Sequence, residues 1–217
     1  RELYWQTIQG NWELSIGLKK IFWGITESVH LVDILNQTDV VESFDGEQKL
    51  GQPMVHFSYL SKFGTFDIIA MPYFRKREFA GVDARFRFPV VFDRDDLSFE
   101  NEDLEEWYPS FAFRWGHSAG AFDFGISQFH GIGREPLFKP SSDGISLDLF
   151  YPIIDQTGIE LQVIPGPAIW KLEGIVRFSD VQDMFALAAS LEYTVGNINN
   201  SGLDIGLIGE YLYDDRD

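Results

Sequence analysis

Charged side chains recur at alternate positions within the apolar stretches of this chain, so acids and bases share one face of each predicted strand. Where such strands enclose a water-filled lumen, carboxylates that oppose Lys and Arg set the charge selectivity of a pore. In a closed interior the same charges only pair with each other. We expect the first arrangement. The candidate lumen-lining residues are Glu13, Lys19, Arg114, Asp123, Asp148, Glu160, Lys171, Glu173, Arg177, Glu192, Asp204 and Glu210.

A second group of candidates lies in the long connection over residues 24–53, where apolar spacing predicts a short helix at 28–36. His30 and Asp33 stand one helical turn apart, a spacing that suits two metal ligands or an acid and base pair. A solvated loop helix explains them more simply, and we favour it. If this loop folds into a lumen, His30, Asp33 and Asn36 become candidate constriction residues.

A hydrolase embedded in the fold is an alternative suggested by Ser127, His117 and His130. A site made of Ser, His and an acid is recognised by geometry, and scattered residues of these types occur in any chain. The sequence therefore predicts no enzyme.

An acidic stretch offers many hard oxygen ligands of the kind that calcium prefers. It lacks the ordered spacing and the central glycine of an EF-hand loop, so a solvated surface loop is the simpler interpretation. A calcium titration without a rise in thermal stability would reject the ion site. The candidate calcium ligands are Asp93, Asp95, Asp96, Glu100, Glu102 and Asp103.

Composition narrows the class of protein. The chain has 217 residues, of which 45% are hydrophobic and 16% aromatic, enough for a single β domain over 1–217 with a large apolar surface. Its 34 acidic and 17 basic residues give a net charge of -17, which argues against a nucleic-acid partner. Cysteine is absent, so no disulfide or thiolate site exists. No apolar run is long enough for a transmembrane helix, a test that does not detect transmembrane strands.

Alternating apolar and polar residues predict about ten strands plus a partial first one. A further hairpin is expected around 84–88. The expected strands cover residues 2–6, 12–23, 55–59, 66–70, 111–117, 122–126, 145–150, 159–163, 170–178, 185–195 and 203–213.

Connections of sorted length indicate how these strands are arranged. An up-and-down barrel in an outer membrane has short turns on the periplasmic side and long loops outside, with lipid against its apolar face. A soluble barrel inverts the two faces, and periodicity alone does not distinguish them. Glycines on the polar face and aromatic residues such as Trp12, Trp23 and Trp170 near strand ends favour the membrane. The short turns are expected at 61–64, 118–121, 155–158 and 179–183, and the break at 165–167 is shorter than the scheme requires.

The stretch GLKKIFWG at 17–24, followed by LVDILNQTD at 31–39, resembles the strand-then-loop signature of porin-like outer-membrane proteins of Gram-negative bacteria. LIGEYLYDDR at 207–216 is similar to a late barrel strand that runs into an extracellular loop. The resemblance implies a β-barrel of roughly sixteen or more strands in the cell outer membrane, used for passage of small solutes. The chain departs from a complete member in lacking a signal peptide and a closing aromatic strand, so we expect a fragment.

The sequence thus predicts an all-β, antiparallel up-and-down transmembrane barrel that acts as a passive channel for small hydrophilic solutes. Its expected partners are outer-membrane lipid or lipopolysaccharide and the solutes, with no nucleic acid, and a homo-oligomer is left open. No cofactor is expected other than calcium at the acidic stretch. Two alternatives stay open: a non-conducting barrel that is structural or binds at the surface, and a soluble β-barrel or sandwich that binds a ligand.

Overall fold

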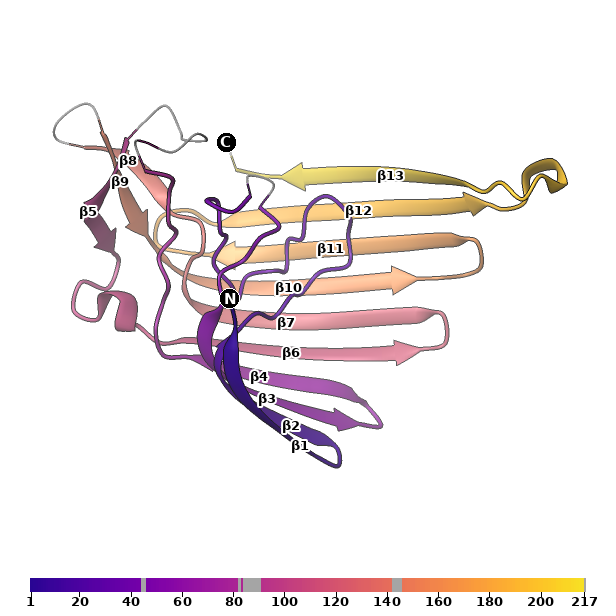
Figure 1. Ribbon diagram of the computed structural model, residues 1–217, viewed down its shortest axis with the longest axis horizontal. Coiled ribbons are helices and arrows are strands. Elements are labelled where there is room, and N and C mark those ends of the chain that lie inside the picture. The colour runs from indigo at the N-terminus through magenta and orange to yellow at the C-terminus, as the bar shows by residue number, and fades with distance from the viewer. Residues whose placement is uncertain (44–45, 82, 84–90, 142–145, 217) are drawn as a thin grey trace.

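The chain folds into one large antiparallel sheet with a small sheet at one end (Figure 1). The computed structural model describes residues 1–43, 46–81, 83, 91–141 and 146–216, with the backbone alone at 91–96 and 146. The large sheet has ten strands, and neighbours in it follow one another along the chain. In spatial order they are β1 (Leu3–Gln9), β2 (Trp12–Lys19), β3 (Gln52–Ser61), β4 (Gly64–Met71), β6 (Ser110–Ala119), β7 (Phe122–Ile132), β10 (Ile153–Val163), β11 (Ala168–Phe178), β12 (Met184–Val195) and β13 (Ile205–Asp214).

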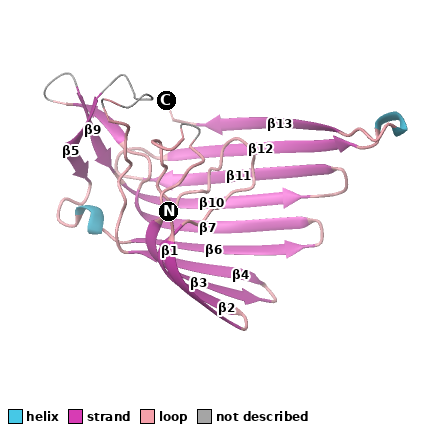
Figure 2. Cartoon of the chain, viewed as in Figure 1, coloured by secondary structure: helices cyan, strands magenta, loops and turns pink. Residues whose placement is uncertain are grey.

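The small sheet is built from β5 (Val91–Phe99), β9 (Ser146–Tyr151) and β8 (Leu137–Pro140), with β9 in the middle. Helical structure in the described part is limited to the 3₁₀ turns η1 (Glu105–Trp107) and η2 (Ile198–Asn200) (Figure 2). None of the helices among the described residues has the length and apolarity to span a membrane. The prediction of an all-β, up-and-down antiparallel sheet is confirmed. The sheet is not closed: the free edges of β1 and β13 pair with no other described strand.

The connections are sorted by length between the two ends of the large sheet. At one end, the turn end, short links join β1 to β2, β3 to β4, β6 to β7 and β10 to β11, and the longer link 196–204, which contains η2, joins β12 to β13. The other end, the loop end, carries the long segments 20–51, 72–109 and 133–152. The link at 165–167 is shorter than a long outer loop would be, but it lies at the turn end and therefore fits the alternation of short turns and long loops.

Several local predictions are wrong. Residues 155–158 form no turn, because they lie within β10. The strand near 145–150 is β9 of the small sheet, and the strand from Trp12 stops at Lys19. The turn at 179–183 joins β11 to β12 at the loop end, opposite to the other short turns. The hairpin expected around 84–88 lies outside the described residues.

Register assigns each side chain to one of two faces of the large sheet. Glu13 pairs with Ser58, Ser58 with Asp67, and Asp67 with Arg114, so these four residues point to the same side. We call this side the polar face. The opposite side, the apolar face, is covered with large hydrophobic residues that are exposed in the isolated sheet, for example Ile126 at 47%.

Segment 20–51 without residues 44–45, which we call the inward loop, packs against the polar face and supplies four of the thirteen buried residues of the main core. Val32 and Leu35 of this loop are completely buried, and Trp23 is 5% exposed. They lie with Ile69, Phe129 and other apolar side chains of the sheet in one hydrophobic cluster. In Figure 1 the inward loop crosses the later strands of the sheet, far from its own position in the chain. The loop has no helix at 28–36, so that prediction is wrong.

Candidate functional site

A chain of ion pairs and hydrogen bonds begins at the first strands of the polar face. The ammonium of Lys19 lies 3.3 Å from a carboxylate oxygen of Glu13 and 3.1 Å from Nδ1 of His56. The other ring nitrogen of His56 lies 2.9 Å from Oδ1 of Asp67. Because a protonated lysine can only donate, Nδ1 accepts and Nε2–H donates to Asp67. Strands β2, β3 and β4 are therefore linked by charged groups.

Arg114 and Glu160 continue this polar face on β6 and β10. Both Nε and Nη2 of Arg114 contact Oε2 of Glu160, at 3.1 and 2.5 Å. The pair lies over Gly125 of β7, where a Cβ would come within 2.6 Å of Glu160 Oε2. A Cβ at this position would crowd the ion pair, and the ends of the two side chains would have to shift to make room. Glu160 is 5% exposed, and its Oε1 has no hydrogen-bond donor in the described structure.

Glu173 on β11 anchors the inward loop. Its Oε1 accepts hydrogen bonds from the backbone of Ile25 at 2.6 Å and Thr26 at 3.0 Å. The Thr26 hydroxyl lies between this oxygen, at 2.7 Å, and the carbonyl of Val29, at 2.6 Å, and its single proton is shared between the two acceptors. Its Oε2 accepts from the Val32 amide at 3.3 Å. This carboxylate is completely buried and satisfies backbone donors that no helix or sheet satisfies. Glu173 is therefore a docking point for the loop.

The tip of the inward loop is also tied to the last strands. Lys171 of β11 forms ion pairs with Glu27 of the loop and, at 2.5 Å, with Glu192 of β12. Glu210 of β13 accepts hydrogen bonds from the backbone and hydroxyl of Ser28. These contacts connect the loop to strands more than a hundred residues later in the chain.

Arg134, just after β7, holds the other side of the inward loop. It is 4% exposed and donates to the carbonyls of Leu35 at 3.1 Å and Ile132 at 3.0 Å. Its guanidinium also lies 5.1 Å from the ring centre of Phe74 and 5.3 Å from that of Phe129. Burial lowers the pKa of Arg134 to about 9. The loop is thus fixed from two sides: the Glu173 carboxylate accepts hydrogen bonds from its N–H groups, and the Arg134 guanidinium donates to one of its carbonyls.

The three predicted constriction residues are structural parts of this loop. The side chain of Asn36 joins the two ends of the loop by bonding Ile21 N at 2.9 Å and the carbonyls of Lys19 and Leu50 at 3.0 and 2.9 Å. Asp33 lies 3.1 Å from the ammonium of Lys49, and burial raises the pKa of Asp33 despite this lysine. His30 instead packs edge-on against Phe22 at 4.7 Å. His30 and Asp33 therefore do not share a metal or a proton.

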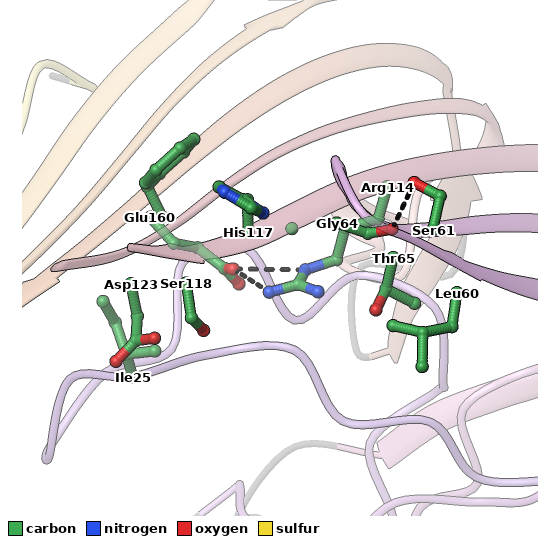
Figure 3. Close-up of a pocket in the computed structure, with 12 residues that line it drawn as sticks. Ile25, Leu60, Ser61, Gly64, Thr65, Arg114, His117, Ser118, Asp123 and Glu160 are labelled. Carbon is green, nitrogen blue, oxygen red and sulfur yellow. Dashed lines mark hydrogen bonds and ion pairs between the residues drawn. The ribbon is translucent and has the colours of Figure 1, made fainter. Parts of the chain in front are cut away.

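A cavity of about 410 Å³ lies between the inward loop and the turn end of the sheet (Figure 3). Figure 3 shows the Arg114 and Glu160 pair in its middle, with Asp123 and Ile25 to one side and Thr65 and Ser61 to the other. Its lining combines apolar and polar side chains and includes Ile25, Thr65, Arg114, Ser118, Asp123 and Glu160. The cavity therefore exposes charged groups of the polar face to a space of solute size.

Most predicted lumen-lining residues share the polar face, but two do not. Asp148 lies on β9 of the small sheet, paired in register with Lys139. Asp204 precedes β13, where its Oδ1 accepts from the Asn197 amide at 2.7 Å in the turn. Both assignments to the lumen-lining face are wrong. The strand of Asp148 belongs to the small sheet, and β13 starts after Asp204. Trp23 is likewise buried in the loop core and marks no strand end.

The residues suggested for a hydrolase do not come together. Ser127 faces the inward loop, whereas His130 lies on the apolar face of the same strand. His130 instead contacts Asp155 Oδ1 at 2.9 Å and the Tyr108 hydroxyl at 3.1 Å. His117 packs against Trp115. The serine and the histidine are separated by the sheet itself.

The predicted calcium ligands are only partly described. Asp93, Asp95 and Asp96 belong to β5, and their side chains are outside the described residues. Glu100 Oε2 accepts from the backbone of Ile153 at 2.6 Å. No group of three acidic or histidine side chains suited to a metal occurs in the part of the chain that the structure describes. Calcium binding here stays a prediction.

Some residues of the site were not foreseen. His56 and Asp67 join the polar network, Arg134 positions the loop, and Ile25 lines the cavity. His56 and Asp67 lie on the polar side of predicted strands, so the alternation alone could have placed them there. Arg134 gives no such signal, because its partners come from distant segments.

In comparisons with known proteins, no family model, no curated protein and no solved structure matches this chain.

Proposed function

We propose that this sheet is part of an outer-membrane β-barrel that lets small hydrophilic solutes pass by diffusion. The observation that carries the proposal is the apolar face. Exposed side chains cover it strand after strand, including Ile68 at 54%, Phe113 at 41% and Ile159 at 47% exposed. A monomeric soluble protein rarely leaves so large an apolar surface open to water, whereas a barrel in a bilayer requires one.

Aromatic residues support the same orientation. Trp12, Tyr59, Trp115, Trp170 and Tyr193 all lie on the apolar face near the turn end. Amphipathic rings concentrate where hydrocarbon meets headgroups, so this row fits one interface of a membrane. The turn end would then face the periplasm, and the long segments with the small sheet would lie outside the cell.

The free edges of β1 and β13 fit a larger closed wall. A lipid-exposed sheet edge leaves backbone N–H and C=O groups without partners, which a hydrocarbon layer does not tolerate. In this proposal, further strands join β13 to β1 and complete a barrel of roughly sixteen or more strands. The polar face then lines the lumen, and the inward loop narrows it.

A non-conducting barrel is the second candidate, and one observation favours it. Val32 and Leu35 of the inward loop are completely buried against the sheet, so this part of the interior is filled. If further strands brought more loops of this kind, the lumen would be plugged. The barrel would then serve as a scaffold for the acidic surface segments.

Planar-bilayer recording with the purified protein tests the proposal. Stepwise conductance increments that persist without an energy source are expected for a passive channel. Recovery of the protein from the outer-membrane fraction, and its need for detergent, would accompany them. A protein that stays monomeric in water without detergent would overturn the membrane assignment and favour a soluble binding protein. A membrane-inserted protein without conductance would favour the scaffold.

A further inference from the structure

We propose that the cavity in Figure 3 is a binding site for small organic cations. This inference rests on the proposed channel and names the class of solute that its polar face prefers. The cavity is large enough for such a solute, because about 410 Å³ corresponds to on the order of a dozen water molecules.

The basic side chains of the polar face are already neutralised. Lys19 is paired with Glu13, and Arg114 with Glu160. Lys171 is paired with glutamates, and Arg177 lies 3.2 Å from a carboxylate oxygen of Glu135. Of these four, Arg114 lines the cavity, and an anion that entered would have to displace Glu160 from it.

Carboxylates of the polar face are in surplus. Glu173 and Glu210 are bound by N–H groups of the inward loop, so they carry charge without a basic partner among the described contacts. Asp123 is the least satisfied of the three, since in the described structure its Oδ2 accepts from the side-chain amide of Gln162 at 3.5 Å, the limit of a hydrogen bond. It lines the cavity directly. A cation is thus attracted by a charge that no lysine or arginine neutralises among the described contacts.

The second observation is the unsatisfied oxygen of Glu160. This side chain is 4% exposed, lines the same cavity, and its Oε1 receives no hydrogen bond in the described structure. A buried acceptor without a donor is unfavourable, and an ammonium group in the cavity would supply one. Asp123 attracts the cation, and Glu160 offers the acceptor that orients it.

Putrescine and potassium are the probes for the test, with the protein reconstituted in planar bilayers. We expect the reversal potential in a KCl gradient to show cation preference, and putrescine to block the current reversibly. Asp123→Asn should weaken the block about fivefold, the effect of one unit charge at contact distance in water. Asp180→Asn, an exposed aspartate at the loop end, is the matched control and should change neither quantity.

Glu160→Gln provides a second variant and should also weaken the block. A conducting protein without cation preference, or one whose block is the same in Asp123→Asn, would overturn the inference while leaving the channel intact. If no current is seen, the channel proposal fails. Calorimetry of putrescine with the detergent-solubilised protein then tests the binding site independently of conduction. Binding that is lost in Asp123→Asn supports the site, and absence of binding rejects it.

Discussion

Replacing Glu173 by glutamine should release the inward loop from the sheet. The carboxylate is completely buried and takes hydrogen bonds from Ile25, Thr26 and Val32 through its two oxygens. Glutamine has the same size, but an NH₂ group replaces one of the two carboxylate oxygens. Because both oxygens accept hydrogen bonds from N–H groups, the NH₂ group faces another donor in either orientation of the amide. The loss combines charge-assisted hydrogen bonds with a buried donor left unpaired.

We expect a cost of about 2 to 3 kcal/mol for docking of the loop, because one hydrogen bond to a charged group is worth about 1.5 to 3 kcal/mol. This corresponds to an increase of about 30- to 150-fold in the undocked population, since 1.4 kcal/mol is a factor of ten. Amide hydrogen exchange over residues 25–32 measures this population directly. Exchange should accelerate by the same factor, while the strands of the sheet keep their protection.

Glu13→Gln is the control, because Glu13 lies on the same face but its ion-pair partner is Lys19 of its own strand. Thr26→Val is a milder variant that removes the hydroxyl between Glu173 Oε1 and the carbonyl of Val29 and should cost about 1.5 kcal/mol. Unchanged exchange over 25–32 in a folded Glu173→Gln protein would refute the role assigned to this carboxylate. Equal acceleration in Glu13→Gln would refute its specificity.

Three further outcomes are expected. Leu35→Ala should lower the free energy of unfolding by about 2 to 5 kcal/mol in denaturant titrations, because the side chain is fully buried in the loop core; a loss below 1 kcal/mol would contradict this packing. Burial raises the pKa of Glu135, but Arg177 and Arg216 outweigh it and hold that pKa below its ordinary 4.5. The stabilisation is thus present above about pH 4.5 and lost as the pH falls. In Glu135→Gln the free energy of unfolding, followed by thermal unfolding, should therefore fall less on acidification, by a margin under about 1 kcal/mol. Ile126→Arg, which places a charge on the apolar face, should cost about 2 to 4 kcal/mol when folding is measured in lipid vesicles and little in detergent-free water if the protein is soluble.

The strands and their faces could be predicted because alternation is a local property. The polar positions on β2, β6, β10 and β11 follow from spacing alone, and the register of the sheet then brings them together. Gly158 shows where this reasoning fails. It suggested a turn, but it lies within β10, where a Cβ would come within 2.9 Å of Val32 Cγ1 of the inward loop. The glycine is needed for loop packing, which no local pattern reveals.

The expected helix at 28–36 failed for a related reason. Val32, Ile34 and Leu35 have apolar spacing because they are buried against the sheet, and the side chains of Glu173 and Asn36 satisfy nearby backbone groups in place of helical hydrogen bonds. Tertiary contacts thus override the local preference. The pairing of Arg114 with Glu160 was equally beyond prediction, since it depends on the register of β6, β7 and β10.

The contact between Thr26 and Glu173 joins residues 147 positions apart. The inward loop is made early in synthesis, but its docking point exists only after β11 has been added to the sheet. Contacts between such distant residues form slowly, because the intervening chain must first be ordered. We therefore expect the sheet to assemble around an open interior and the loop to settle last. Refolding should accordingly show a late kinetic phase, detected by Trp23 fluorescence, that follows the gain of β-structure.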